Sequence, residues 1–99
     1  MTSYRLTNTP NMVFNISLNG LDFEVTIRSF RGAMYASISS DGIILSAGRR
    51  IVSNRPIFPV EVERMMNGSL RVLCSVADVP THKMFDGTTA DFVYIPYGE

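Results

Sequence analysis

Residues 12–27, MVFNISLNGLDFEVTI, decide the fold of this chain. Apolar and polar side chains alternate up to residue 19, and the alternation resumes after Gly20. A period of two with β-branched and aromatic residues is typical of a strand with one buried face. Asn19-Gly20 favours a tight hairpin turn between the two runs, because both residues tolerate positive φ. We therefore expect residues 12–19 and 21–27 to pair as an antiparallel hairpin that buries Phe14, Ile16, Leu18, Phe23, Val25 and Ile27.

The same turn chemistry recurs along the chain. Further dipeptides that end in Gly stand at the ends of apolar runs: Arg31-Gly32, Asp41-Gly42, Asn67-Gly68 and Asp86-Gly87. They bound further expected strands at residues 33–39, 43–52, 70–76 and 90–96, and Gly48 inside the second of these predicts a bulge or bend. The sequence predicts an all-β fold, a small antiparallel barrel or sandwich of six to seven short strands.

Two segments leave alternatives open. Residues 60–66 alternate as a strand at first but also fit one or two helical turns, so Asn67-Gly68 is either a hairpin turn or a helix C-cap. Residues 1–10 are either a loose arm or an added edge strand, and an arm with an aromatic anchor at Tyr4 is one way in which a subunit binds its neighbour. We expect one β domain over residues 1–99, with residues 1–10 as a possible N-terminal arm.

Composition limits the classes of function. Formal net charge is zero at pH 7, so general attraction to nucleic acid or to an anionic membrane is not expected. A single cysteine cannot form an internal disulfide and no signal peptide precedes the first strand, which favours maturation in a reducing cytoplasm. The longest apolar stretch, at residues 43–45, is far shorter than a membrane span of about 20 residues. We therefore expect a soluble protein.

The residue types needed for catalysis or metal binding are sparse. Cys74 and His82, with Asp78 or Asp86, are the one conceivable nucleophile–base–acid set, but Cys74 alternates with apolar residues and is better explained as part of the core. Alternation also explains the carboxylate pairs Asp22/Glu24 and Glu61/Glu63 as solvent-facing positions. One His and one Cys are too few for a structural zinc site, and no Gly-rich phosphate loop is present. The sequence predicts no catalytic, cofactor-binding or metal-binding residues, no cofactor, and no enzymatic activity.

Arginine dominates the basic residues. Eight of the nine are arginine and one, Lys83, is lysine. Arginine suits partly buried ion pairs, and protein interfaces are enriched in arginine, methionine and aromatic residues. The chain has six methionines and ten Phe or Tyr residues, which points the same way. This bias predicts a protein that contacts other proteins through partner-binding residues Tyr4, Arg5, Arg31, Arg49, Arg50 and Arg55.

Arg49 and Arg50 are a special case among these residues. Because they are adjacent in a strand, their side chains point to opposite faces of the sheet. The pair can then bridge two neighbours, or one of the two arginines can pair internally with Glu61 or Glu63.

An alternative function is a small β-barrel that binds single-stranded nucleic acid or another ligand. Such barrels place aromatic and basic residues on one face, and Phe14, Phe23, Phe30 and Tyr35 are candidates for that face. However, Phe14 and Phe23 share their faces with aliphatic residues, which assigns them to the core. Zero net charge and a single lysine also disfavour nucleic acid as a partner.

The order and spacing of several short motifs resemble a known family. They are Pro10-Asn11-Met12-Val13-Phe14, Leu18-Asn19-Gly20 followed by a strand that ends near Arg28, Asp41-Gly42-Ile43-Ile44-Leu45-Ser46-Ala47-Gly48, Gly68-Ser69-Leu70-Arg71-Val72, Asp78-Val79-Pro80 and Val93-Tyr94-Ile95-Pro96. Together they resemble the small baseplate plug proteins of contractile-tailed phages, from about Tyr4 to Pro96.

The resemblance implies a non-enzymatic structural protein of a phage tail baseplate. It implies a compact β domain that acts as a plug or adaptor near the hub and the tail tube, with no catalytic residues to carry over. The expected partners are other baseplate, hub or tail-tube proteins and further copies of the chain, without a membrane. The expected location is the virion, after assembly in the host cytoplasm.

Overall fold

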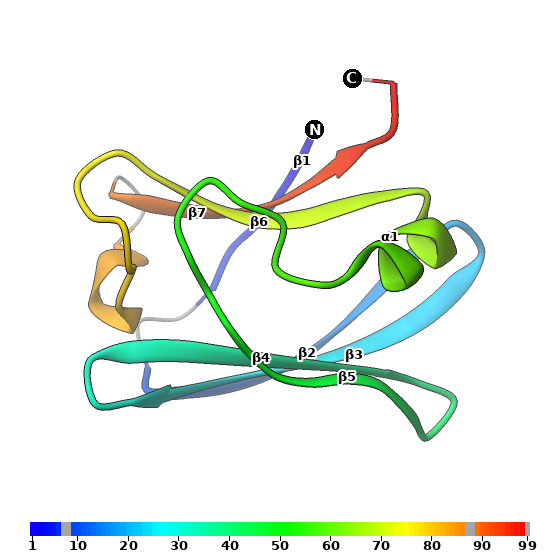
Figure 1. Ribbon diagram of the computed structural model, residues 1–99, viewed down its shortest axis with the longest axis horizontal. Helices are drawn as coiled ribbons and strands as arrows, with labels where there is room; N and C mark the ends of the chain where they lie inside the picture. The colour runs from blue at the N-terminus through cyan, green and yellow to red at the C-terminus, as the bar shows by residue number, and fades with distance from the viewer. Residues whose placement is uncertain (7–8, 87–88, 99) are drawn as a thin grey trace.

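The computed structural model describes residues 1–6, 9–86 and 89–98, which form two antiparallel sheets packed face to face (Figure 1). The four-stranded sheet has the order β2-β3-β4-β5, with bounds Asn11–Leu18, Leu21–Phe30, Ala33–Ser40 and Ile43–Arg50. The three-stranded sheet has the order β1-β7-β6, with bounds Thr2–Tyr4, Ala90–Pro96 and Gly68–Cys74. The expected all-β sandwich is confirmed, and the sheets do not close into a barrel.

Three tight hairpins connect the strands of the larger sheet. Their tips are Asn19-Gly20, Arg31-Gly32 and Asp41-Gly42, and both residues of each tip have positive φ, close to 50° at the first and 77° at the second. This pair of conformations defines the type I′ turn, whose twist matches that of the flanking strands. The turn chemistry read from the sequence is therefore confirmed at these three positions, while Gly87 lies outside the described residues.

The first hairpin has the expected register and the expected buried face. Phe14 is opposite Val25 and Ile16 is opposite Phe23 across β2 and β3. Five of the six predicted core residues are buried, whereas Phe14 is half-buried. Its ring meets that of Phe92 on β7 edge-on, with centroids 5.3 Å apart, so the side chain still points into the interface between the sheets.

The ambiguous segment is a helix, α1, over Val60–Met66. The Pro59 carbonyl accepts hydrogen bonds from the N–H groups of Val62 and Glu63, and Asn67 ends the helix in the left-handed conformation, with φ 55°. Asn67-Gly68 is therefore a C-cap and not a hairpin turn. Glu61 and Glu63 lie in the first turn, where the helix dipole favours negative charge.

Strands β6 and β5 differ from regular strands of the expected length in two places. Strand β6 ends at Cys74, before the expected end at residue 76, and the Val76 side chain is exposed. In β5, Gly48 has positive φ and donates its N–H to Ser37 Oγ, and the register with β4 shifts between Ala36 and Ser39. The irregularity predicted for Gly48 is therefore present.

The core lies between the sheets and is closed along one side by the chain that crosses from β5 to α1 (Figure 1). Ile51 N–H donates to Met34 O in the larger sheet, and Ile57 N–H donates to Leu70 O in the smaller one. Asn54 continues this contact, because its side-chain amide donates to Cys74 O and accepts from Cys74 N–H. Residues 51–57 thus attach to both sheets, and the two sheets share one hydrophobic core.

The N-terminal residues form the edge strand that was one of the two alternatives. Strand β1 pairs with β7, with Thr2 opposite Tyr94 and Tyr4 opposite Phe92. The Tyr4 ring packs edge-on against Phe92 at a centroid distance of 6.2 Å. Residues 2–4 are therefore attached to the chain's own core rather than extended as a free arm.

Candidate protein-binding surface

The outer face of the four-stranded sheet carries a row of arginine and tyrosine side chains. Arg28 on β3 is opposite Tyr35 on β4, and Tyr35 is opposite Arg50 on β5. Residues directly opposite in neighbouring strands project to the same face, about 5 Å apart at Cβ. Both arginines are exposed and Tyr35 is half-buried, so two guanidinium groups flank one aromatic ring on the surface.

The hairpin tip between β3 and β4 extends this row. Phe30 lies two residues after Arg28 on the same face, and 61% of its surface is exposed. The Arg31 guanidinium carbon lies 5.3 Å from the centre of the Phe30 ring, a cation–π contact. We call the five residues Arg28, Phe30, Arg31, Tyr35 and Arg50 the arginine patch. It is basic and aromatic, the combination that protein interfaces favour.

The far end of the same face has the opposite charge. Asp22 and Glu24 are exposed on β3, and Asp41 is exposed at the tip between β4 and β5. Asp22 accepts a hydrogen bond from Ser17 Oγ across the hairpin. Strand β5 adds Ile44 to this face, opposite Ser39, while the adjacent Ile43 points to the other face; both are more than 60% exposed. The charges of the outer face are therefore separated along the strands although the chain is neutral overall.

The structure divides the partner-binding residues predicted from the sequence. Arg31 and Arg50 belong to the arginine patch. Arg49 is exposed opposite Ala36, so it projects to the other face of the sheet, as its position next to Arg50 predicts. Arg5 and Arg55 are exposed outside the patch, in the segment after β1 and in the crossover respectively. Their contact with a neighbouring protein stays a prediction.

Arg49 and Arg50 have no hydrogen-bond or ion-pair partner among the described residues. Neither guanidinium makes a hydrogen bond or an ion pair with another described residue, so the internal pairing with Glu61 or Glu63 is not formed. Glu63 instead accepts a hydrogen bond from the Tyr97 hydroxyl. Both arginines remain available to a neighbouring molecule.

Tyr4 occupies a different environment from the exposed arginines. Its ring is half-buried against Phe92, and burial raises the pKa of its hydroxyl, with a smaller contribution from the nearby Tyr94. A contact between Tyr4 and a neighbour stays a prediction, and it would involve only the part of the side chain that Phe92 does not cover.

The partner-binding residues predicted from the sequence do not include Arg28, Phe30 and Tyr35, although Phe30 and Tyr35 are among the candidates for a nucleic-acid-binding face. Alternation within β3 already placed Arg28 on the polar face, but only the register shows that Tyr35 stands between Arg28 and Arg50. Arg71 illustrates the opposite case, an arginine used internally. Its guanidinium donates to Ser69 Oγ and to Asn54 O, and so attaches the crossover to β6.

The conceivable catalytic set is not assembled. Cys74 is buried and its Sγ lies 3.9 Å from Met84 Sδ, whereas the His82 ring shares a hydrogen bond with Ser29 Oγ. No hydrogen bond joins Cys74 to His82. Within residues 1–6, 9–86 and 89–98, no three metal-ligating side chains gather in one place.

The aromatic residues considered for nucleic-acid binding do not share one surface. Phe23 is buried in the core and Phe14 packs on Phe92, so of these four residues only Phe30 and Tyr35 lie on the outer face.

No helix within the described part of the chain is long and apolar enough to span a membrane.

The described residues form a β-sandwich with a basic, aromatic surface on one sheet. Comparison with known families shows to which family the chain belongs. The family model described as cyanophage baseplate Pam3 plug gp18 matches residues 1–97, and the chain belongs to this family. A search of curated proteins finds no match. The protein is therefore a structural component of a phage tail baseplate, and it interacts with other baseplate proteins.

Proposed function

We propose that this protein is a non-enzymatic plug or adaptor that binds hub or tail-tube proteins of the baseplate through the arginine patch. The observation that carries the proposal is the row in which Arg28 and Arg50 flank Tyr35 on an open sheet face, with both arginines exposed. Membership of the plug family supports a place in the baseplate but does not by itself select a surface of the chain.

The physical chemistry of the patch explains why it suits a protein partner. A guanidinium group is weakly hydrated and presents a planar fork of donors, so it loses less on desolvation than an ammonium group does. Tyr35 and Phe30 add rigid apolar area between the charges.

The acidic end of the same sheet face makes a further copy of the chain a second candidate partner. An antiparallel arrangement of two copies brings the acidic end of one against the arginine patch of the other.

The test is incorporation of variants into tails assembled in the host cell. Arg50→Ala removes a patch residue and is expected to give folded protein that fails to enter tail particles. Arg49→Ala removes its neighbour on the opposite face, and a loss of incorporation in this variant, alone or in the double variant, is expected if the two arginines bridge two neighbours. Truncation of a paired and desolvated arginine costs about 2–5 kcal/mol of binding, whereas a solvated one costs almost nothing. Circular dichroism shows whether each variant folds, and mass spectrometry of purified particles measures its copy number.

The matched control is Arg64→Ala, which removes an exposed arginine from α1, away from the patch. It is expected to enter tails at the wild-type level. Normal incorporation of Arg49→Ala, Arg50→Ala and the double variant would show that these arginines are ordinary surface, and the proposal would be wrong.

The non-enzymatic part of the proposal has its own test. Cys74→Ser places a hydroxyl among the apolar side chains that surround Cys74, which is 4% exposed, and is expected to destabilise the fold by about 1–3 kcal/mol. Tail assembly is expected to remain normal at temperatures where the variant is folded. A variant that is fully folded and enters tails but abolishes infection would restore the hypothesis of a nucleophile.

A further inference from the structure

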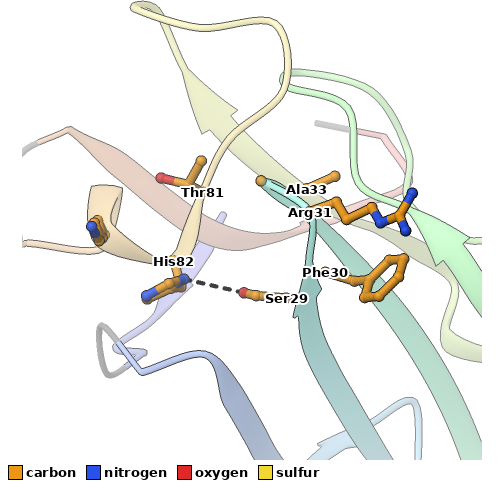
Figure 2. A pocket seen from close by; sticks show the side chains of 8 residues that line it. Ser29, Phe30, Arg31, Ala33, Thr81 and His82 are labelled. Carbon is orange, nitrogen blue, oxygen red and sulfur yellow. Dashed lines mark hydrogen bonds between the residues drawn. The ribbon is translucent and has the colours of Figure 1, made fainter.

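A pocket of about 310 Å³ opens at the end of the sandwich next to the arginine patch (Figure 2). One wall is the hairpin tip over residues 29–33, and the other is residues 81–83, which overlap the start of the 3₁₀ helix η1, His82–Met84. Figure 2 shows Ser29 and His82 pointing toward each other, with Arg31 and Phe30 on the other side of the hairpin strand. The hydrogen bond between Ser29 Oγ and His82 Nδ1, 3.2 Å, joins the two walls.

The lining has two cationic side chains, two hydroxyl groups, the Phe30 ring and the His82 imidazole, and none of its residues is acidic. Arg31 and Lys83, the one lysine of the chain, are both exposed and come from opposite walls. Neither side chain forms an ion pair or a hydrogen bond with another described residue. An acidic partner can therefore pair with either cation without displacing an internal partner among the described residues.

The backbone at Arg31 gives an independent reason to regard this pocket as a site. Five described residues other than glycine have positive φ, and four of them are Asn or Asp. Arg31 is the exception, with φ 50°. Asn and Asp tolerate this conformation, whereas a long side chain has no compensating local hydrogen bond. A residue held in an unfavourable conformation that a simple substitution would relieve points to a functional requirement for its side chain.

We propose that this pocket binds an acidic segment of a neighbouring baseplate protein. A carboxylate of that segment pairs with Arg31, a second carboxylate pairs with Lys83, and an apolar side chain between them packs on Phe30. The inference rests on the proposed function and goes further, because it assigns the pocket and gives the chemistry of the partner.

Charge and size favour a protein segment over nucleic acid. A nucleic-acid strand needs a continuous basic track, whereas Asp22, Glu24 and Asp41 at the far end of the sheet repel phosphates. The pocket has room for a few side chains only. Arginine pairs with a carboxylate through two parallel hydrogen bonds, which gives such a segment a defined orientation.

Binding can be measured with the purified protein and short peptides. In an NMR titration, acetyl-Glu-Leu-Glu-amide is expected to shift the backbone amide signals of residues 29–33 and 81–83 in a saturable way. Acetyl-Gln-Leu-Gln-amide is expected to bind at least tenfold more weakly. Equal binding of the two peptides, or no saturable shifts, would overturn the proposal, and so would tighter binding of a thymidine octanucleotide than of the acidic peptide.

Two substitutions at equivalent turn positions isolate the side chain. Arg31→Asn keeps the type I′ turn and is expected to weaken the acidic peptide at least tenfold. Asp41→Asn changes the same position of the next hairpin, where φ is 53°, and is expected to leave binding unchanged. Lys83→Gln is expected to weaken binding several-fold. Wild-type affinity in Arg31→Asn would show that the pocket does not use the guanidinium.

Tail particles separate this inference from the proposed function. Arg31→Asn and Lys83→Gln are expected to enter tails at reduced copy number, and Asp41→Asn at the wild-type level. If the wild-type chain is found in tails and both pocket variants are present at equal copy number, the pocket proposal fails while the baseplate role stands. Absence of the wild-type chain from tails would contradict the proposed function itself.

Discussion

The hairpin tips at Arg31-Gly32 and Asp41-Gly42 have nearly the same backbone conformation and opposite chemistry. Their first residues have φ of 50° and 53°, and their glycines have φ of 78° and 77°. Asp41 is among the residues that the left-handed region favours, and Arg31 is not. One tip therefore follows the preference of the turn, while the other gives up part of that preference and places a guanidinium group over Phe30.

The comparison shows which part of a tight turn is constrained. Glycine at the second position of each tip adopts the positive φ that the turn requires. The first position can then carry a side chain that serves binding instead of the turn. The tip beside the pocket carries arginine, and the tip at the acidic end carries aspartate, so the turns reinforce the charge separation of the sheet face. Two substitutions at hairpin tips test this account, and one at a glycine packed between strands gives the contrasting case.

Gly68→Ala is expected to have the largest effect, although it lies at no hairpin tip. A Cβ there would come within 2.5 Å of the Ile95 carbonyl oxygen and 2.8 Å of the Tyr94 ring. Since backbone cannot rotate away, overpacking should cost about 3 kcal/mol of unfolding free energy, measured by urea denaturation. A loss below about 1 kcal/mol would show that β6 and β7 separate easily here.

Gly20→Val tests whether a tip glycine acts through its backbone alone. A Cβ at Gly20 would meet nothing within 4 Å, and φ is 76°. The expected loss of about 1–2 kcal/mol therefore comes from conformational strain without a clash. Gly20→Asn is the matched control, because asparagine tolerates positive φ and should cost less. Equal losses in the two variants would contradict this explanation.

Arg31→Asn is expected to have the smallest effect and the opposite sign. Asparagine removes an unfavourable conformation worth about 1–2 kcal/mol, and the variant loses an exposed cation–π contact worth about 0.5–1 kcal/mol. The net result should be a gain of about 0.5 kcal/mol, visible as a higher urea midpoint. Asp41→Asn should leave the midpoint almost unchanged. A lower midpoint in Arg31→Asn would mean that this arginine is retained for stability.

Local patterns in the sequence predict the hairpins well because turn and alternation are both local. Asn19-Gly20 sets the turn, and alternation on either side sets the face, so residues 12–27 need no distant partner to be read correctly. For residues 60–66 the sequence does not decide between a strand and a helix, because Val60 to Glu63 alternates like a strand. The helix is selected by Pro59 at its start, by Asn67 at its end, and by burial of Val62 and Met66.

The candidate surface could be predicted only in part. The excess of arginine over lysine predicts Arg31 and Arg50 as partner-binding residues. Their place in the patch depends on the registers of β3 with β4 and of β4 with β5, which the sequence does not give. Tyr4 is a second residue whose environment the sequence does not predict. Its ring packs on Phe92, a partner at the other end of the chain that no local pattern indicates. Contacts between distant segments are what the sequence alone did not provide.

The most direct test of the central claim is a cryo-EM reconstruction of the tail baseplate at side-chain resolution. The claim is that the outer face of the four-stranded sheet is the contact surface of this protein. We expect Arg28, Tyr35 and Arg50 to be covered by another baseplate protein, with carboxylates within hydrogen-bond distance of the guanidinium groups. A baseplate in which this face is open to solvent, while other surfaces hold the protein in place, would contradict the claim.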